Sequence, residues 1–226
     1  MLARYGVPDA REGAFDALLS ALECSGDAPS TVRERADALD RHVADSLSGL
    51  EIEQLRAAWT IADIGAGAGF PGLPLALALP TARVDLLESR LRSAAVIERL
   101  AHAAGAVNAH AMTTRAEQWA AAAGAAAYDV VTARALASLA VLAEYAAPLL
   151  RQDGVLVAWK GARDADEETA GAAAAARLGL ELRDVRAVVP FPGARNRHLH
   201  LVQKVGPTPP RLPRRPGMAK KRPLGS

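Results

Sequence analysis

The sequence predicts an α/β fold: a mostly parallel seven-stranded sheet with helices on both faces, preceded by N-terminal helices. Three observations lead to this fold class. From residue 60 onward, short runs rich in β-branched residues alternate with longer alanine-rich segments, as in sheets joined by helical crossovers. A glycine-rich turn follows the first run. Only residues 190–197 separate the last two runs, too few for a helical crossover, so the last strand is predicted to be antiparallel.

Residues 1–58 are predicted to form a helical extension packed on the core. Phe15, Leu18, Leu19 and Leu22 recur at the spacing of one helix face. Residues 26–30, Gly-Asp-Ala-Pro-Ser, then break this pattern. A second amphipathic helix is predicted from apolar residues that share one face, namely Val32, Ala36, Leu39, Val43, Leu47 and Leu50.

Residues 59–205 are predicted to form the sheet domain. Helices are expected between most strands, including Leu91–Ala104 and Leu136–Leu150. The alanine-rich runs Ala120–Ala127 and Ala170–Ala176 have ordinary helix-forming composition. The strands are expected at Thr60–Gly65, Arg83–Glu88, Val107–Met112, Tyr128–Arg134, Gly154–Lys160, Leu182–Val189 and His198–Lys204.

The composition indicates the compartment. Half of the residues are apolar and only 4% are aromatic, so the core is expected to be aliphatic. The single cysteine, Cys24, excludes an internal disulfide and fits a reducing cytoplasm. No signal-peptide pattern opens the chain, and prolines interrupt the weakly polar stretch Trp59–Pro80. We therefore expect a cytoplasmic protein without a membrane span.

The net charge of +2 hides an uneven distribution. Residues 206–226 form a basic, proline-rich tail without an acidic residue. Such a tail suggests a polyanionic partner, although basic tails are about equally often only solvated. Its basic residues are Arg211, Arg214, Arg215, Lys220, Lys221 and Arg222.

The segment from Asp63 to Gly72, Asp-Ile-Gly-Ala-Gly-Ala-Gly-Phe-Pro-Gly, is the most informative part of the chain. Glycines at a turn between a strand and a helix let a ligand lie against the backbone. Gly67-x-Gly69-x-x-Gly72 matches the dinucleotide fingerprint, and Glu88 lies at roughly the 20-residue distance expected of a ribose-binding acid. This match alone is weak support for a dinucleotide.

The same turn also matches the pattern of S-adenosylmethionine sites, Gly65-x-Gly67-x-Gly69 with Asp63 two residues ahead. A dinucleotide would bring its anionic pyrophosphate to this turn, where the Asp63 carboxylate would repel it. S-adenosylmethionine carries an ammonium and a sulfonium group, and Asp63 would attract both. The charges therefore favour S-adenosylmethionine.

Polar residues follow five successive predicted strands, where a ligand of such a sheet binds. The end of the first strand supplies Asp63 and the glycine turn, and Glu88 ends the second, where its carboxylate could accept both ribose hydroxyls. The pair Ala116-Glu117 follows the third and offers an amide and an acid to the adenine amino edge. Arg134 and Lys160 end the fourth and fifth. For any one of these residues alone, a helix cap or a surface charge is the alternative.

Several segments resemble the RsmG (GidB) family, bacterial methyltransferases that modify N7 of a guanine in small-subunit ribosomal RNA. The resemblance covers most of the chain. The Gly-Phe-Pro-Gly-Leu-Pro run is far more specific than the glycines alone. The similar segments are Arg41–Leu47, Asp63–Ala76, Leu86–Ser89, Arg115–Glu117, Ala133–Ala135, Lys160-Gly161, Arg197–Leu199 and Pro213–Gly217.

The resemblance implies a Rossmann-like class I methyltransferase that uses S-adenosylmethionine and releases S-adenosylhomocysteine. The implied substrate is a guanine in a hairpin loop of 16S rRNA near the decoding region, and the implied partner is the small ribosomal subunit. The cofactor residues implied by the resemblance are Gly65, Phe70, Ala116, Glu117 and Arg134, to which the turn and strand ends add Asp63, Gly67, Gly69 and Glu88.

Methylation of guanine N7 needs no general base, because N7 has an in-plane lone pair and no proton. The sequence offers no convincing nucleophile–base pair, so no catalytic residue is assigned. The protein must align N7 with the methyl group and exclude water, effects worth up to about 7–11 kcal/mol. Candidate donors to the base or to phosphates are Arg134, Lys160, Arg197 and His198. No cluster has metal-ligand spacing, so no metal is predicted.

RNA contacts are expected from Arg41, from Arg197 and from the tail residues Arg211, Arg214, Arg215, Lys220 and Lys221. His42, beside an apolar helix face, is expected to be buried and hydrogen-bonded instead. We expect removal of residues 207–226 to weaken binding of RNA or of the ribosomal subunit and to leave S-adenosylmethionine binding intact.

Other functions stay open from the residues alone. An S-adenosylmethionine-dependent methyltransferase could act on another RNA, a protein or a small molecule, because the fold does not identify the acceptor. A dinucleotide oxidoreductase would be stabilised by NAD and would not bind S-adenosylmethionine. A non-catalytic RNA- or ribosome-binding protein would keep the tail without turning over a cofactor.

Overall fold

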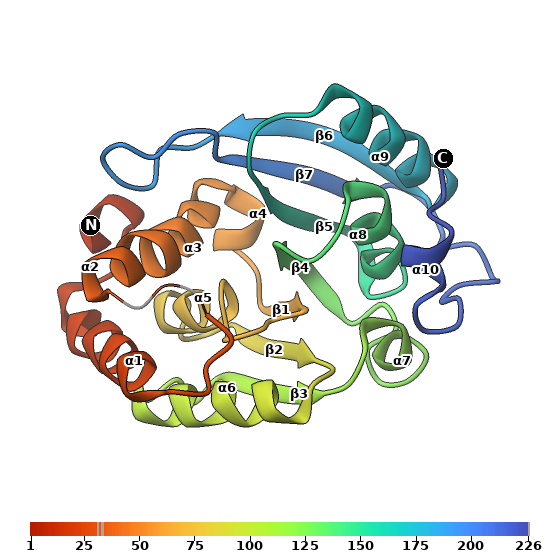
Figure 1. Cartoon of the computed structure of the whole chain (residues 1–226). Coiled ribbons are helices and arrows are strands. Elements are labelled where there is room, and N and C mark those ends of the chain that lie inside the picture. Colours follow the sequence, from red (N-terminus) through yellow and green to blue (C-terminus); the bar gives the residue numbers. More distant parts are fainter. Residues whose placement is uncertain (31, 33, 226) are drawn as a thin grey trace.

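The computed structural model describes residues 1–30, 32 and 34–225, and it has the α/β fold that the sequence predicts (Figure 1). Within these residues the strands form one seven-stranded sheet in the order β3-β2-β1-β4-β5-β7-β6. The strands are β1 (Thr60–Ile64), β2 (Arg83–Glu88), β3 (Ala109–Thr113), β4 (Tyr128–Arg134), β5 (Leu150–Lys160), β6 (Leu180–Ala187) and β7 (His198–Lys204).

Helices precede the sheet and connect its strands. The N-terminal ones are η1 (Leu2–Tyr5), η2 (Asp9–Arg11), α1 (Glu12–Cys24), α2 (Arg35–Ala38), η3 (Leu39–Ala44), α3 (Asp45–Leu47), η4 (Ser48–Glu51) and α4 (Glu53–Arg56). The later ones are α5 (Gly72–Ala78), α6 (Leu91–Ala103), α7 (Ala116–Ala120), α8 (Leu139–Ala146), α9 (Ala165–Arg177) and α10 (Met218–Lys221). No helix in the described part of the chain is long and apolar enough to cross a bilayer.

The strand directions follow from the lengths of the connections. Strands β1 to β5 pair in parallel, joined by helical crossovers. β7 pairs antiparallel with both β5 and β6. The short connection from β6 to β7 cannot hold a crossover helix, so the predicted antiparallel closure is confirmed. The carboxyl ends of β1 to β5 consequently meet at one edge of the sheet.

Two helical layers cover the sheet, and successive residues of a strand face opposite layers. Ile61 lies in one core with α1, α5 and α6, whereas Ala62 lies in the other core with α8 and α9. Figure 1 shows the N-terminal helices with α5 and α6 on one side of the molecule and α7, α8 and α9 on the other. The N-terminal extension thus completes the first layer.

The prediction of one regular amphipathic helix carrying Val32 to Leu50 is wrong. The chain passes instead through α2, the π-helical stretch η3, α3 and the 3-10 turn η4. The Ser46 hydroxyl donates to the backbone carbonyl of His42, and the Ser48 hydroxyl donates to that of Asp45. Hydroxyls that bond to the preceding turn favour local bending, and π-helical turns cluster at functional sites.

Other predicted boundaries shift where tertiary contacts override propensity. The helix expected at Leu136–Leu150 is shorter, because Leu136 packs on the glycine turn and Leu150 begins β5. The alanine run after Ala120 is a turn rather than a helix. Gly124 approaches the Trp119 indole so closely that a Cβ there would lie 2.3 Å from a ring carbon. The third strand begins two residues later than expected.

Candidate functional site

The turn between β1 and α5 presents open backbone. Gly65 and Gly67 have φ values of 67° and 60°, which side chains rarely adopt. A Cβ at Gly67 would have one neighbour within 4 Å, the carbonyl oxygen of Gly65 at 3.9 Å. The backbone at Gly67 is therefore accessible to a ligand. At Gly65, by contrast, a Cβ would lie 2.5 Å from a methyl carbon of Leu136.

The structure places Asp63 behind this turn rather than on its ligand side, which corrects our expectation of direct contact with a cation. The side chain has no exposed area. Its two carboxylate oxygens accept from the Gly72 amide and the Thr132 hydroxyl, each at 2.9 Å. Burial raises the pKa of Asp63 to about 7, against the lowering effect of these hydrogen bonds. Asp63 therefore holds the end of the turn in place.

Glu88 is the acid that lies against the turn. Its Oε2 accepts from the Gly67 amide at 3.0 Å, and its Oε1 accepts from the Arg90 amide at 2.8 Å. A carboxylate beside Gly67 would repel a pyrophosphate there and attract a cationic ligand. The charge argument for a cationic cofactor consequently moves from Asp63 to Glu88.

A cavity of about 120 Å³ lies beside the turn. We call it the Glu117 cavity; it is lined by Gly65, Leu87, Ala116, Glu117, Leu136 and Tyr145, and by residues of the C-terminal segment. Glu117 is 8% exposed. The cavity brings together three of the residues predicted for the cofactor, Gly65, Ala116 and Glu117, from the ends of two strands, β1 and β3. Phe70, also predicted there, is not among its lining residues.

A second cavity, of about 380 Å³, lies at the carboxyl ends of β4 and β5. We call it the basic cavity, because its lining includes Arg41, His42, Arg134, Lys160, Arg197 and His198, together with Asp45 and Trp159. The structure thus gathers in one place all four candidate substrate-orienting residues and the predicted RNA contact Arg41. Their roles stay predictions.

Asp45 is the acidic centre of the basic cavity. It is 6% exposed, and its Oδ2 accepts from Arg134 at 3.0 Å. Its Oδ1 lies 3.6 Å from the Arg197 Nε, and both of these atoms are buried without a hydrogen bond among the described residues. Trp159 donates its indole N–H to the Asp45 carbonyl at 2.8 Å. Asp45 therefore holds two guanidinium groups at the cavity wall.

His42 fixes Arg134 from the other side. Arg134 donates to Nδ1 of His42 at 3.1 Å, so the ring proton lies on Nε2, which bonds to the Ser30 hydroxyl at 2.8 Å. Burial, with the nearby Arg134 charge, lowers the pKa of His42 to about 4. The ring stacks on Phe70 with centroids 4.4 Å apart. Phe70 is 5% exposed, so its ring supports His42.

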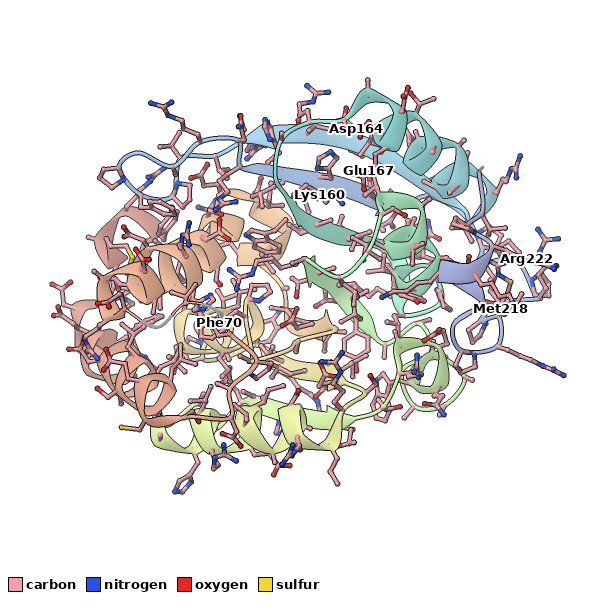
Figure 2. The ribbon with its side chains drawn as sticks, viewed as in Figure 1. Phe70, Lys160, Asp164, Glu167, Met218 and Arg222 are labelled. Atoms are coloured by element: carbon pink, nitrogen blue, oxygen red, sulfur yellow. The ribbon has the colours of Figure 1, made fainter. Side chains whose placement is uncertain are left out.

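Lys160 and His198 occupy the β5 side of the basic cavity. Lys160 pairs with Glu167 of α9 at 2.6 Å, and Figure 2 labels these two residues close together. Asp164 caps α9 by accepting from the Glu167 amide, which sets the position of Glu167. His198 Nδ1 lies 2.8 Å from the Gly161 carbonyl. Lys160 is therefore a neutralised donor, and a substrate would share it with Glu167.

The loop after β4 lies between the two cavities. Arg134, Ala135 and Ala137 line the basic cavity, whereas Leu136 lines the Glu117 cavity. Ala135 has a φ of 52°, which allows these neighbouring side chains to diverge. Neighbouring residues of one loop thus line both cavities.

The C-terminal residues do not form a free tail. Arg214, predicted to bind RNA, is paired with the buried Glu144, and RNA contact by it stays a prediction. Lys220 donates to the Leu136 carbonyl at 3.3 Å and lines the Glu117 cavity. Arg211, Arg215 and Lys221 are exposed, and RNA contact by them stays a prediction. Among the described residues, no group of three His, Cys, Asp or Glu side chains could hold a metal ion.

A family model described as rRNA small subunit methyltransferase G (GidB) matches residues 30–199. The chain belongs to this family. The rRNA small subunit methyltransferase G of Rubrobacter xylanophilus is 42% identical, over 85% of this chain and 75% of its own length. That of Bacillus subtilis is 32% identical, over 86% of this chain and 82% of its own. The oxidoreductase alternative is thereby excluded.

Solved structures show the fold. A predicted O-methyltransferase from Agrobacterium tumefaciens superposes with a TM-score of 0.56 at 22% identity, covering 72% of this chain and 81% of its own. A 16S rRNA (adenine(1408)-N(1))-methyltransferase variant from Catenulisporales acidiphilia superposes with a TM-score of 0.54 at 18% identity, covering 70% of this chain and 90% of its own. The fold is that of class I S-adenosylmethionine-dependent methyltransferases, with an antiparallel closure of the sheet.

The sequence reasoning gave Asp45 and Trp159 no role. Both lie close to residues that it did select: Asp45 follows Arg41 by one helical turn, and Trp159 precedes Lys160. The family resemblance included the Arg41–Leu47 segment, which was the available signal for Asp45. Nothing in the local pattern of β5 shows that Trp159 reaches across to this segment, because the two are 114 residues apart.

Proposed function

We propose that this protein transfers a methyl group from S-adenosylmethionine to N7 of a guanine in a loop of 16S rRNA near the decoding region. Membership of the rRNA small subunit methyltransferase G family supports methyl transfer to small-subunit rRNA. The guanine, its N7 atom and the loop are the finer parts of the proposal. One observation carries the proposal. The basic cavity gathers Arg134, Lys160 and Arg197, and the loop that follows Arg134 also lines the Glu117 cavity beside the glycine turn.

The residues present suit a cationic nucleoside cofactor. The backbone at Gly67 is open, and two acids at the turn and its neighbouring cavity, Glu88 and Glu117, suit an ammonium, ribose hydroxyls and an adenine amino group. Gly65, Gly67, Glu88, Ala116 and Glu117 would hold the cofactor. When bound, S-adenosylmethionine supplies an electrophilic methyl group on a positively charged sulfur.

The chain's own contribution is to orient the base and exclude water. Arg134 and Arg197 have donors and no acceptor, so they suit guanine O6 or phosphates and leave the N7 lone pair free. Asp45 holds both guanidinium groups before substrate arrives, which lowers the entropy cost of alignment. No residue needs to accept a proton from N7. A base in a loop can enter the cavity, whereas the major groove of an RNA duplex is too narrow for such contact.

The decisive experiment maps the methylated nucleotide. Purified protein and S-adenosylmethionine are incubated with small subunits that lack the modification, and nuclease fragments of the 16S rRNA are analysed by mass spectrometry. We expect one N7-methylated guanine in a loop. Methylation of another base atom, of protein or of no RNA at all would refute the proposal.

A pair of variants tests the basic cavity. Arg197→Ala removes a cavity donor, and we expect methylation at saturating RNA to fall about 10-fold to 100-fold. Arg183→Ala removes the same charge from the exposed face of β6, where Arg183 pairs with Glu181. Methylation by this control is expected to equal that of wild type. Equal rates for the two variants would remove Arg197 from the site.

A further inference from the structure

The C-terminal segment, residues 212–225, is packed against the helices that flank the Glu117 cavity. Figure 2 shows Met218 and Arg222 at α10, which packs on α8. Arg214 forms a two-point pair with Glu144 of α8, with Nε and Oε1 2.6 Å apart, and it also donates to the Arg222 carbonyl at 2.8 Å. The Glu144 side chain is only 4% exposed. A buried pair with these additional hydrogen bonds anchors the segment.

Two contacts bring this segment to the Glu117 cavity. The Gly217 amide donates to Glu117 Oε1 at 2.8 Å, across 100 residues of sequence. Gly217 has a φ of 84°, so the turn that aims its amide at Glu117 is one that glycine adopts readily. Lys220 lies on the cavity wall and donates to the Leu136 carbonyl at 3.3 Å. The C-terminal segment thus completes the cavity that holds the predicted cofactor residues.

We propose that this segment is one wall of the cofactor pocket, with Lys220 and the Gly217–Glu117 contact enclosing the adenosine part of the cofactor. The inference rests on the proposed function, because it takes the ligand to be S-adenosylmethionine. Gly217 occupies one oxygen of Glu117 and leaves Oε2 for the amino group of adenine. Leu87 and Tyr145 provide apolar walls for the purine ring.

Cofactor and segment then stabilise each other. A ligand that contacts both the core and the segment binds more tightly when the segment is closed, and it shifts the opening equilibrium by the same factor. This reverses the expectation from sequence that removal of residues 207–226 leaves cofactor binding intact. Lys220 and Lys221 are exposed, and trypsin can cleave the peptide bonds that follow them when the segment opens. Bound cofactor, which favours the closed segment, should therefore protect these bonds from cleavage.

The test measures binding without any methylation. S-adenosylhomocysteine is titrated by calorimetry into wild type, Lys220→Ala and Lys221→Ala, since Lys221 carries the same charge but does not line the cavity. We expect Lys220→Ala to weaken binding about threefold to tenfold and Lys221→Ala to leave it unchanged. In wild type, saturating S-adenosylhomocysteine should slow trypsin cleavage at residues 220–221 at least about tenfold, a loss read by mass spectrometry.

The outcomes separate the two proposals. If wild type fails to bind S-adenosylhomocysteine, the proposed function fails. If wild type binds it, but Lys220→Ala binds equally well and trypsin cleavage is no slower with ligand, the wall inference alone is overturned. Weaker binding by Lys220→Ala together with ligand-dependent protection supports both.

Discussion

The charge on Asp45 should determine whether the basic cavity is assembled. Asp45→Asn keeps the shape of the side chain and one acceptor oxygen, but it removes the charge that holds Arg134 at 3.0 Å and Arg197 at 3.6 Å. The two guanidinium groups would then repel each other without a compensating acid. We expect both to leave their positions, and methylation to fall while the glycine turn is unchanged.

The magnitude follows from burial. The side chains of Asp45 and Arg134 are 8% and 16% exposed, and loss of one partner from a buried pair costs about 3–5 kcal/mol. Arg197 is 36% exposed and therefore screened, and asparagine retains an acceptor. We expect the free energy of unfolding to fall by about 2–3 kcal/mol. A 1 Å displacement of an orienting group lowers the rate about 100-fold, which sets the expected loss in kcat.

Asp129→Asn is the matched control. Asp129 is also a buried carboxylate: it pairs with Arg151 at 2.6 Å and accepts from two backbone amides, but at the opposite end of β4. Urea unfolding should show similar destabilisation in both variants, and single-turnover methylation should fall in Asp45→Asn alone. Equal methylation rates at saturating RNA would refute the reasoning. Weaker binding of S-adenosylhomocysteine by Asp45→Asn would place Arg134 at the cofactor.

Three further predictions concern the turn and its surroundings. Gly67→Ala and Gly6→Ala both place a side chain at positive φ, costing each about 1–2 kcal/mol in unfolding, but Gly67→Ala alone should weaken cofactor binding by calorimetry; equal affinities would show that no ligand meets Gly67. The pKa of His42 is about 4 in the folded protein, so between pH 4 and 6.5 the unfolded chain binds more protons than the folded one. The stability due to His42 is therefore lost as the pH falls through this window, by on the order of 3 kcal/mol. His42→Gln should flatten this pH dependence of the free energy of unfolding in urea titrations. Asp63 acts oppositely, because its pKa is raised to about 7 and the folded protein loses stability as the pH rises from 3.8 to 7. The stability of Asp63→Asn should therefore increase relative to that of wild type between pH 5 and pH 8. A stability difference between the two proteins that does not change with pH would place Asp63 outside the interior.

The fold could be predicted because its information is local. Strand and helix periods, the glycine turn and the short connection of residues 190–197 are each readable within about a dozen residues, and they fix the layer order and the antiparallel closure. The break in the second helix could not be predicted from its apolar spacing. It depends on the Ser46 and Ser48 hydroxyls bonding to the preceding turn, and on Trp159 packing against Gly49 from a distant strand.

The positions of the candidate residues were predicted where the strand-end rule applies. Arg134, Lys160, Glu88 and the pair Ala116-Glu117 lie at the carboxyl edge of the sheet as expected. The misplacement of Asp63 had a detectable cause. It shares a strand face with Ile61, which packs beneath α5, so strand alternation alone directs its carboxylate behind the turn.

The C-terminal residues show why composition misled about charge. A count of six cations without an acid cannot reveal that Arg214 reaches Glu144, which lies 70 residues earlier. Nor can it reveal that Ala219 is buried, with an exposed fraction of only 1%. Lys160 and Arg134 are likewise paired with Glu167 and Asp45. The charge available to an RNA phosphate is therefore smaller than the sequence suggests, whereas the basic groups held in place are concentrated at the two cavities. Such pairing favours orientation of a bound base over attraction of RNA from a distance.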